Sequence, residues 1–499
     1  MLQARIGNES YTASGLESYF YHFRKHVIGI DQTFMTAYGK QGILYADWTA
    51  SGRLFRPIEY KLTDLYGPFV ANTHTESNVT GTAMTTAYKH ARDIIKNHVH
   101  ADEYDVLLTG GSGMTAMVNK LQRLLGLKVP DKWRKKLQIP DEERPIIFVT
   151  HMEHHSNQLT WMETIGDVVI VDPDHHGMVD PAQLERQLQA HQNRRLKIGA
   201  FTACSNVTGV HTPYHALSRK MHQYGGLCFI DFSASAPYVD IHMHPTDPLE
   251  KLDAIYFSPH KFLGGPGTSG VLIMDSRLIT SPIPDHPGGG TVLWSNPWGG
   301  KRYNWDVESR EDGGTPGFLQ TIKTALCITL KEKMGTQQMQ HREWEMLDIL
   351  LPKLGSIDGL HVLDGHITKR KGIVSFYVEK IHFNLIVRLL NDRYGIQTRG
   401  GCSCAGTFGH YLFHMNQTVS QQITDKIDSG DLSNKPGWVR ISLHPIMTNR
   451  EIEYIIQAIR DITENIKKYK QDYIYLPQQN EFHHVGSVSN PPVEQWFSW

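Results

Sequence analysis

The residue most able to do covalent chemistry is Lys261, which ends the segment Ser258-Pro-His-Lys and is followed by the glycine-rich run 262–267. An apolar run at 254–257 comes directly before this segment, so we expect the lysine to lie at the end of a buried strand. Burial lowers the pKa of a lysine, and a neutral amine can form a Schiff base and move protons. Ser258 and His260 could donate hydrogen bonds to a phosphate. A lysine after a strand is more commonly a solvated loop residue, so its interpretation depends on its neighbours.

Two other segments supply groups that such a lysine would need. Asp231 ends an apolar run 30 residues before Lys261, and a carboxylate beside a pyridinium nitrogen keeps it protonated, which makes the ring an electron sink. The glycine-rich segment 109–115 precedes an apolar helix, so its amides and the Thr115 hydroxyl can form an anion cradle. Taken singly, Asp231 could cap a helix and segment 109–115 could be a bare turn. Together the three segments indicate a site for a phosphorylated cofactor with a pyridinium ring.

The elements around these residues predict how they are positioned. Short apolar runs rich in Val, Ile and Phe alternate with segments of helical character between about residues 105 and 275, which is typical of βαβ units and a largely parallel sheet. The predicted strands are 105–109, 146–150, 168–171, 198–203, 227–230, 254–257 and 269–274. Ligands bind outside the carboxyl ends of the strands in such sheets, so we expect the polar segments that follow the strands to converge. These segments are 110–113, 151–156, 204–207, 231–235 and 258–261.

The rest of the chain predicts a second, smaller unit. Strand and helix patterns alternate after about residue 356, which indicates an α+β domain. The expected division is a segment at 1–60 that packs with the small domain, a large domain at 61–335, the small domain at 336–470 and a tail at 471–499. A stretch rich in Gly, Pro and Trp at 284–300 is expected to be a long functional loop.

Composition restricts the class of partner. Lys plus Arg number 50 and Asp plus Glu number 51, so no bulk positive field attracts nucleic acid or an anionic membrane. We find neither a signal-peptide pattern nor an apolar window of about 18 uncharged residues. The cysteines form an odd and sparse set, which fits a reducing cytosol better than a disulfide framework. They are Cys204, Cys228, Cys327, Cys402 and Cys404. We therefore expect a cytoplasmic protein whose partner is a small molecule.

Taken in order, the motifs resemble those of the class V aminotransferases of fold type I, and within them the cysteine desulfurase and selenocysteine lyase branch. The resemblance runs from about residue 45 to 465 and rests on the order and spacing of several motifs. Residues 153–157 resemble the family's EHH motif, 205–209 its SNxxG segment, 258–261 the segment of the cofactor lysine, and 314–316 its GTP turn.

This resemblance implies pyridoxal 5'-phosphate (PLP) as the cofactor, a mostly parallel seven-stranded sheet with a smaller α+β domain, and a homodimer with shared active sites. Lys261 would bind the cofactor, Asp231 would face the ring nitrogen, and His154 would stack on the ring. The other cofactor contacts would come from Asn206, Gly113, Met114, Thr115, Ser258 and His260, and from Thr315 toward the neighbouring subunit.

The resemblance also implies how a small amino acid is used. Arg440 matches the arginine that clamps the substrate carboxylate, with Arg399 and Asn206 beside it. Cys404 takes the place of the reactive cysteine of the desulfurases, and Arg399 could lower the pKa of its thiol. Cys402 is an additional thiol that could relay the sulfur. The predicted reaction converts L-cysteine to L-alanine and leaves a persulfide on Cys404 for a sulfur-acceptor protein.

One departure from the family pattern leaves the substrate open. Ala234 stands where the desulfurases usually have a glutamine that bonds the cofactor's 3' oxygen, and Ser233 or Ser235 could compensate. An aminotransferase, an epimerase or another β-lyase of the same family would need no thiol in the 399–406 loop.

Two further alternatives lie outside this chemistry. Cys402, Cys404, His410 and His414 supply two thiols and two imidazoles that zinc accepts, although a Cys-x-Cys spacing is tighter than usual. A non-catalytic protein on the same fold is the other alternative. The presence of Lys261 together with Asp231 and His154 favours an enzyme.

Overall fold

The centre of the molecule is a seven-stranded sheet. The structure is a computed structural model that describes residues 15–486 and 493–498; residues 1–14 of the expected N-terminal segment, and 487–492 and 499 of the expected tail, lie outside the described residues. The strand order is β4-β10-β9-β8-β7-β5-β6. β10 runs antiparallel to both of its neighbours, and the other pairings are parallel. The strands are β4 (Asp105–Gly110), β5 (Ile146–Thr150), β6 (Asp167–Val171), β7 (Lys197–Thr202), β8 (Leu227–Asp231), β9 (Ala254–Phe257) and β10 (Gly270–Asp275).

Each predicted strand of this sheet forms, with bounds that differ by at most one residue from those expected. The strands are apolar throughout because both faces of the sheet are covered. In β5, Ile147 and Val149 belong to one core cluster and Ile146 and Phe148 to the other. The fold class expected from the sequence is confirmed.

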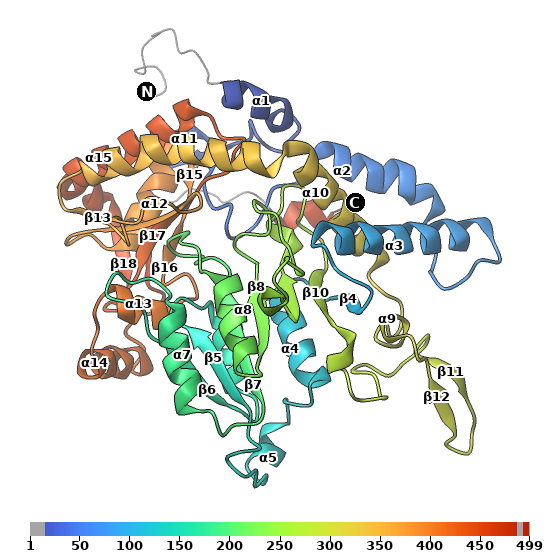
Figure 1. Ribbon diagram of the computed structural model, residues 1–499. Coiled ribbons are helices and arrows are strands. Elements are labelled where there is room, and N and C mark those ends of the chain that lie inside the picture. Colours follow the sequence, from blue (N-terminus) through green and yellow to red (C-terminus); the bar gives the residue numbers. More distant parts are fainter. Residues whose placement is uncertain (1–14, 487–492, 499) are drawn as a thin grey trace.

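Helices cover both faces of the sheet (Figure 1). The core cluster of Ile147 and Val149 also contains residues of α4 (Met114–Leu124) and α6 (His155–Met162), whereas the opposite cluster contains residues of the other helices around the sheet. Those helices are α3 (Val79–His98), α7 (Pro181–Ala190), α8 (Tyr214–Gln223) and α10 (Phe318–Met334). The shorter helices of this part are α2 (Arg56–Tyr60), α5 (Asp131–Arg134) and α9 (Val307–Arg310).

A smaller antiparallel sheet lies beside the first one. Its order is β13-β14-β17-β16, with β13 (Leu360–Val362), β14 (Ile373–Val378), β16 (Arg399–Gly401) and β17 (Trp438–Ser442). The helices of this part are α11 (Thr336–Gly355), α12 (Phe383–Tyr394), α13 (Gly406–Leu412), α14 (Gln417–Asp428) and α15 (Asn449–Tyr469). A capping box at Thr448 and Glu451 starts α15.

The N-terminal elements of the described chain and the segment that follows α15 pack against this smaller sheet and its helices. α1 (Gly15–Arg24) precedes the hairpin of β1 (Thr33–Thr36) and β2 (Gly39–Gly42), and β3 (Leu44–Tyr45) pairs in parallel with β15 (Ile396–Gln397). After α15, β18 (Tyr473–Leu476) and β19 (Glu481–His484) form a hairpin. The Tyr473 hydroxyl donates to Asp392 at 3.0 Å, so residues 473–484 are ordered structure where a tail was expected.

A two-stranded arm projects from the body of the molecule (Figure 1). β11 (Val292–Ser295) and β12 (Lys301–Tyr303) form it, within and just after the predicted 284–300 loop. Trp294 and Trp298 on the arm are exposed. Exposed tryptophans are costly to leave in water, so the arm has the character of a contact surface.

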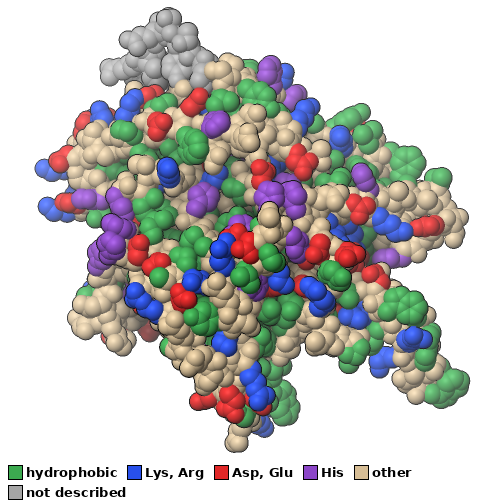
Figure 2. All heavy atoms as spheres, viewed as in Figure 1, with side chains coloured by type: hydrophobic (Ala, Val, Ile, Leu, Met, Phe, Trp, Pro, Cys, Tyr) green, Lys and Arg blue, Asp and Glu red, His purple; other side chains and the backbone are tan. Residues whose placement is uncertain are grey.

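The surface shows no large field of one sign on the face seen in Figure 2, where acidic and basic side chains are interspersed. In the described part of the chain, no helix is long and apolar enough to cross a membrane.

Candidate active site

Most of the predicted site residues converge on one cavity of about 230 Å³ between the two sheets. The carboxyl ends of the central strands form one wall, and β16, β17 and the loop after β16 form the other. The first wall contains Met114, Thr115, His154, Asn206, Asp231, Ser258, His260 and Lys261. The second contains Arg399, Cys404 and Arg440. Gly113 lies directly behind the first wall.

Lys261 ends the helical turn Pro259–Lys261 that follows β9. Burial lowers the pKa of its amine to about 8, and the charge of Asp231 opposes that change. Asp231 ends β8, is 3% exposed, and accepts a hydrogen bond from the Ser233 amide at 2.8 Å. Burial raises the pKa of Asp231. The two groups can therefore hold and release protons inside the cavity.

An anion cradle forms where α4 begins. The Met114 amide donates to Ser258 Oγ at 2.9 Å, and His260 Nδ1 donates to the Ser112 carbonyl at 2.9 Å. A Cβ on Gly113 would lie 3.0 Å from Ser258 Oγ and 3.1 Å from His260 Cε1. Glycine is thus required for the close approach of these two segments. The helix N-terminus and the polar groups around it suit a phosphate.

His154 is the N-cap of α6. Its Nδ1 accepts a hydrogen bond from the Ser156 amide at 3.1 Å, so the proton of the neutral ring is on Nε2. Burial lowers the pKa of His154 to about 3, with a further contribution from Lys261. A neutral, flat imidazole in the wall of the cavity is suited to stack on a ring.

The preceding Glu153 has a structural role that the motif alone did not indicate. Its carboxylate accepts from the Thr150 hydroxyl at 2.7 Å, from the Thr202 amide at 2.9 Å and from the Asn157 side chain at 2.8 Å. These bonds tie together β5, β7 and α6. Burial raises the pKa of Glu153 to about 7.

The cysteine loop joins β16 to α13 and presents Cys404 to the cavity. Ser403 and Cys404 both have left-handed backbones, with φ of 50° and 56°. Cys404 is exposed, whereas Cys402 is partly buried against the core and does not line the cavity. The sequence predicts Cys404 as the nucleophile and Cys402 as an additional thiol; of the two, Cys404 is the one that lines the cavity.

The loop is anchored by the large-domain wall and by its own sheet. Asn206 Nδ2 donates to the Ser403 carbonyl at 2.8 Å, and the His155 amide donates to the Cys404 carbonyl at 2.7 Å. The Trp438 indole donates to Ser403 Oγ at 3.1 Å. The Asn206 Oδ1 atom is buried without a hydrogen-bond partner, so it remains available to a ligand.

The two predicted carboxylate-binding arginines face each other on neighbouring strands. Arg399 of β16 is directly opposite Arg440 of β17. Both form ion pairs with Asp47, at 3.0 Å from Arg399 Nε and 2.8 Å from Arg440. Asp47 did not emerge from the sequence. Its only sequence signal was its position as an acidic residue just after the short apolar segment that forms β3. Acidic residues in such positions are too common to identify a functional residue.

Thr315 and the segment around Ala234 lie differently with respect to the cavity of this single chain. Thr315 is exposed and lies outside the cavity. Ala234 lines the cavity together with Ser233, whose buried hydroxyl has no hydrogen-bond partner, whereas Ser235 does not line it. Of the two serines considered as substitutes for the missing glutamine, only Ser233 is therefore in position.

The alternative zinc set is not assembled. Both ring nitrogens of His410 are engaged, at 2.8 Å from the Gly406 carbonyl and 2.8 Å from Ser420 Oγ. His414 lines a different cavity from Cys404. This alternative is therefore not supported by the positions of its four residues.

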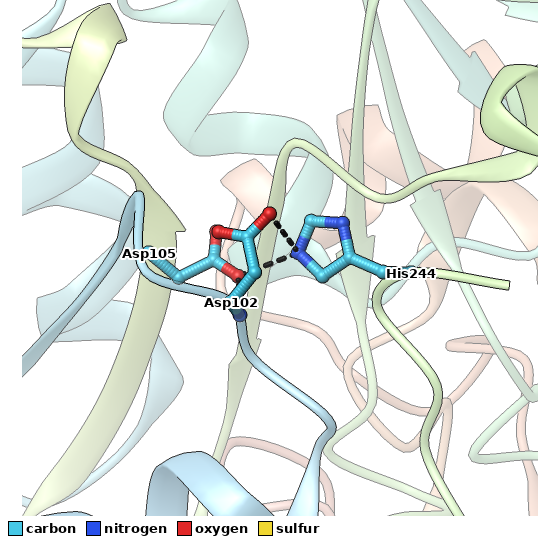
Figure 3. Close-up of side chains that lie close together, drawn as sticks. All are labelled: Asp102, Asp105 and His244. Carbon is cyan, nitrogen blue, oxygen red and sulfur yellow. Dashed lines mark hydrogen bonds and ion pairs between the residues drawn. The ribbon is translucent and has the colours of Figure 1, made fainter.

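Among the described residues, the one group of three acidic, His or Cys side chains with converging ligand atoms lies elsewhere (Figure 3). His244 Nε2 is 2.6 Å from Asp105 and 3.5 Å from Asp102. Asp105 begins β4, so this cluster is at the end of the strand opposite to the cavity. Its contacts hold the loop that precedes β4.

The comparisons with known proteins agree with one another. The model of the family described as Aminotransferase class-V matches residues 44–455. A probable cysteine desulfurase of Halalkalibacterium halodurans is 27% identical over 372 residues, covering 73% of this chain and 84% of that protein. One from Staphylococcus epidermidis is 26% identical and covers 85% and 92%. The solved cysteine desulfurase of Thermococcus onnurineus NA1 has a TM-score of 0.71 at 20% identity, covering 91% of this chain and 99% of that one.

Proposed function

Because the chain belongs to the class-V aminotransferase family, we propose that it is a PLP-dependent cysteine desulfurase that converts L-cysteine to L-alanine. The observation that carries the proposal is the position of Cys404 at a cavity that also contains Lys261 and Arg440. The names of the similar proteins, probable cysteine desulfurases, support the same reaction.

The residues of the cavity fit PLP. Lys261 offers an amine of lowered pKa, Asp231 a buried carboxylate, and the cradle at Met114 and Ser258 a place for a phosphate. Asn206 Oδ1 and the Ser233 hydroxyl are buried polar atoms that have no hydrogen-bond partner among the described residues. When bound, PLP withdraws electrons from the substrate and eases cleavage next to Cα.

The residues of this chain would perform the remaining tasks. Arg440 and Arg399 bind the substrate carboxylate, and Lys261 takes the proton from Cα because its lowered pKa of about 8 leaves a large share of the amine neutral near that pH. The Cys404 thiolate attacks the substrate sulfur, forming an S–S bond as the C–S bond breaks. The electron pair of that C–S bond passes to the substrate, whose Cβ takes a proton. The transferred sulfur is thus oxidised and the Cβ carbon reduced, which leaves L-alanine and a persulfide.

The same geometry supports two partners. The exposed Thr315 turn and the projecting arm with Trp298 favour a homodimer in which these parts contact the second copy. The exposed position of Cys404 suits transfer of sulfur to an acceptor protein. None of the five cysteines is in a disulfide, which fits a reducing compartment such as the cytoplasm.

The test is incubation of the purified, PLP-loaded protein with L-cysteine and a reductant, with alanine and sulfide assayed together. Equal amounts of both products are expected. The variant Cys404→Ala should keep its visible absorbance and lose both products, while the matched variant Cys402→Ala should keep most activity.

A yellow protein that makes neither product would remove the desulfurase proposal and direct attention to transamination, which needs no thiol. Undiminished sulfide from Cys404→Ala would remove Cys404 as the nucleophile.

A further inference from the structure

We infer that Asp47 is a positioning residue that sets the charge of the carboxylate-binding corner, so that the site selects amino acids with a single carboxylate. The inference rests on the proposed role of Arg399 and Arg440 in binding the substrate carboxylate. It adds to that role a residue from the N-terminal part of the chain, far from the other site residues in sequence.

Asp47 divides its two oxygens between the two arginines. Oδ1 lies 2.8 Å from Arg440, and Oδ2 lies 3.0 Å from Arg399 Nε. The arginines occupy directly opposite positions on neighbouring antiparallel strands, where like charges repel. A carboxylate between them offsets this repulsion and fixes both guanidinium groups.

Asp47 acts through the arginines because it does not line the cavity itself. Its side chain is 12% exposed, and that of Arg440 is 4% exposed. Arg440 also donates to the Asn206 carbonyl at 3.1 Å, and its buried Nε has no partner among the described residues. The bonds to Asp47 and Asn206 use two of the five N–H groups of the guanidinium, so the others remain for a ligand.

The backbone holds Asp47 in place. The Ser442 amide donates to the Ala46 carbonyl at 2.8 Å, and the Thr49 amide donates to Ser442 Oγ at 3.0 Å. The segment that contains Asp47 is therefore attached to the end of β17, two residues after Arg440. The backbone of Asp47 is therefore held in place by β17, the strand that carries Arg440.

The charges of this corner match one carboxylate. Two guanidinium groups and the Asp47 carboxylate leave one net positive charge at this corner. An amino acid with one carboxylate neutralises the corner. A second carboxylate, as in L-aspartate, would find no remaining net charge and would be repelled by Asp47.

The test compares the binding of L-alanine and L-aspartate to the PLP-loaded protein, followed by the change in visible absorbance during titration. In Asp47→Asn we expect the affinity for L-aspartate relative to L-alanine to rise about tenfold, which corresponds to about 1.4 kcal/mol. In Arg399→Gln the same ratio should fall, because one positive charge is lost. Arg399 is half exposed, so this second variant tests the inference even if Asp47→Asn does not fold.

Asp167→Asn is the matched control, since Asp167 pairs with Arg194 at the opposite end of the strands and should leave the ratio unchanged. A ratio that stays within about twofold of the unmodified protein in both test variants would overturn the inference. A protein that shows the two opposite shifts but makes no alanine from L-cysteine would instead remove the desulfurase proposal and leave the role of Asp47 standing.

Discussion

The wall of the cavity formed by the central sheet and the wall formed by the small sheet are held in place in different ways. Asp231 is the last residue of β8 and Lys261 ends the turn that follows β9, so buried parallel strands place both of them. Cys404 lies on a loop with two left-handed residues, and Arg440 depends on a contact with Asp47.

The difference separates two kinds of requirement. The first wall needs a rigid arrangement because a cofactor must be held through every turnover. The second wall meets the substrate, and its residues are positioned by contacts between distant segments. Mutations in the first wall should thus affect cofactor binding, and mutations in the second should affect turnover with the cofactor still bound.

The largest effect is expected from Lys261→Ala in the first wall. Loss of the amine removes both the covalent attachment and the proton transfer, so alanine formation should fall by about 10³-fold or more. Borohydride treatment followed by mass spectrometry should find the cofactor fixed to the unmodified protein and absent from the variant. Lys220→Ala, which removes a surface pair with Glu185, is the control and should stay yellow. A Lys261→Ala protein to which borohydride still attaches the cofactor would show that Lys261 does not bind it covalently.

Gly113→Ala should weaken PLP binding by about 30-fold, or about 2 kcal/mol, because the new methyl group would force apart Ser258 and His260. Equilibrium dialysis against PLP measures the change. Gly355→Ala is the matched control, since a Cβ there meets nothing within 4 Å. Equal PLP affinity in both variants would show that the cradle is not the phosphate site.

Ser403→Val should change turnover through the second wall without changing cofactor binding in the first. A β-branched residue in the left-handed region costs about 1 to 2 kcal/mol, which lowers the share of loops that present Cys404 about tenfold. Alanine formation should fall by a similar factor while the PLP affinity stays unchanged. Ser403→Gly loses the same hydrogen bond from the Trp438 indole but adopts this backbone freely, so it should keep more activity than the valine variant. A loss of PLP affinity in the valine variant would mean that the two walls are not independent.

The smallest effect is the pH dependence of cofactor uptake. Burial lowers the pKa of Lys261 to about 8, so the reactive neutral amine becomes more abundant as the pH rises through that value. The rate at which the cofactor-free protein captures PLP should increase about fivefold between pH 7 and pH 8 and level off above about pH 9. Stopped-flow absorbance gives the rate. A rate that keeps rising toward pH 10.5 would indicate a solvated lysine.

The sequence predicted the first wall better than the second for a physical reason. Strand patterns and the polar segments after them are local, and parallel strands bring their carboxyl ends to one edge. Asp231, Lys261 and the cradle could therefore be placed together from the sequence. Asp47 could not, because it lies 352 residues from Arg399 and 393 from Arg440. The motif pointed to Cys404 as the nucleophile, but the left-handed backbone of the loop that presents it could not be predicted, because no periodic pattern encodes it.

The reversed direction of β10 bears on the entropy of the lysine segment. If β10 ran parallel to β9, the chain would need a long crossover connection back to the other end of the strands. Because β10 runs antiparallel to β9 and begins at Gly270, the chain leaves β9 and enters β10 at the same end of the sheet. Residues 258–269 thus form a short loop anchored at both ends, in which closure has already restricted the accessible conformations. Lys261 therefore loses little further conformational entropy when PLP binds. More of the interaction energy then contributes to the affinity for PLP.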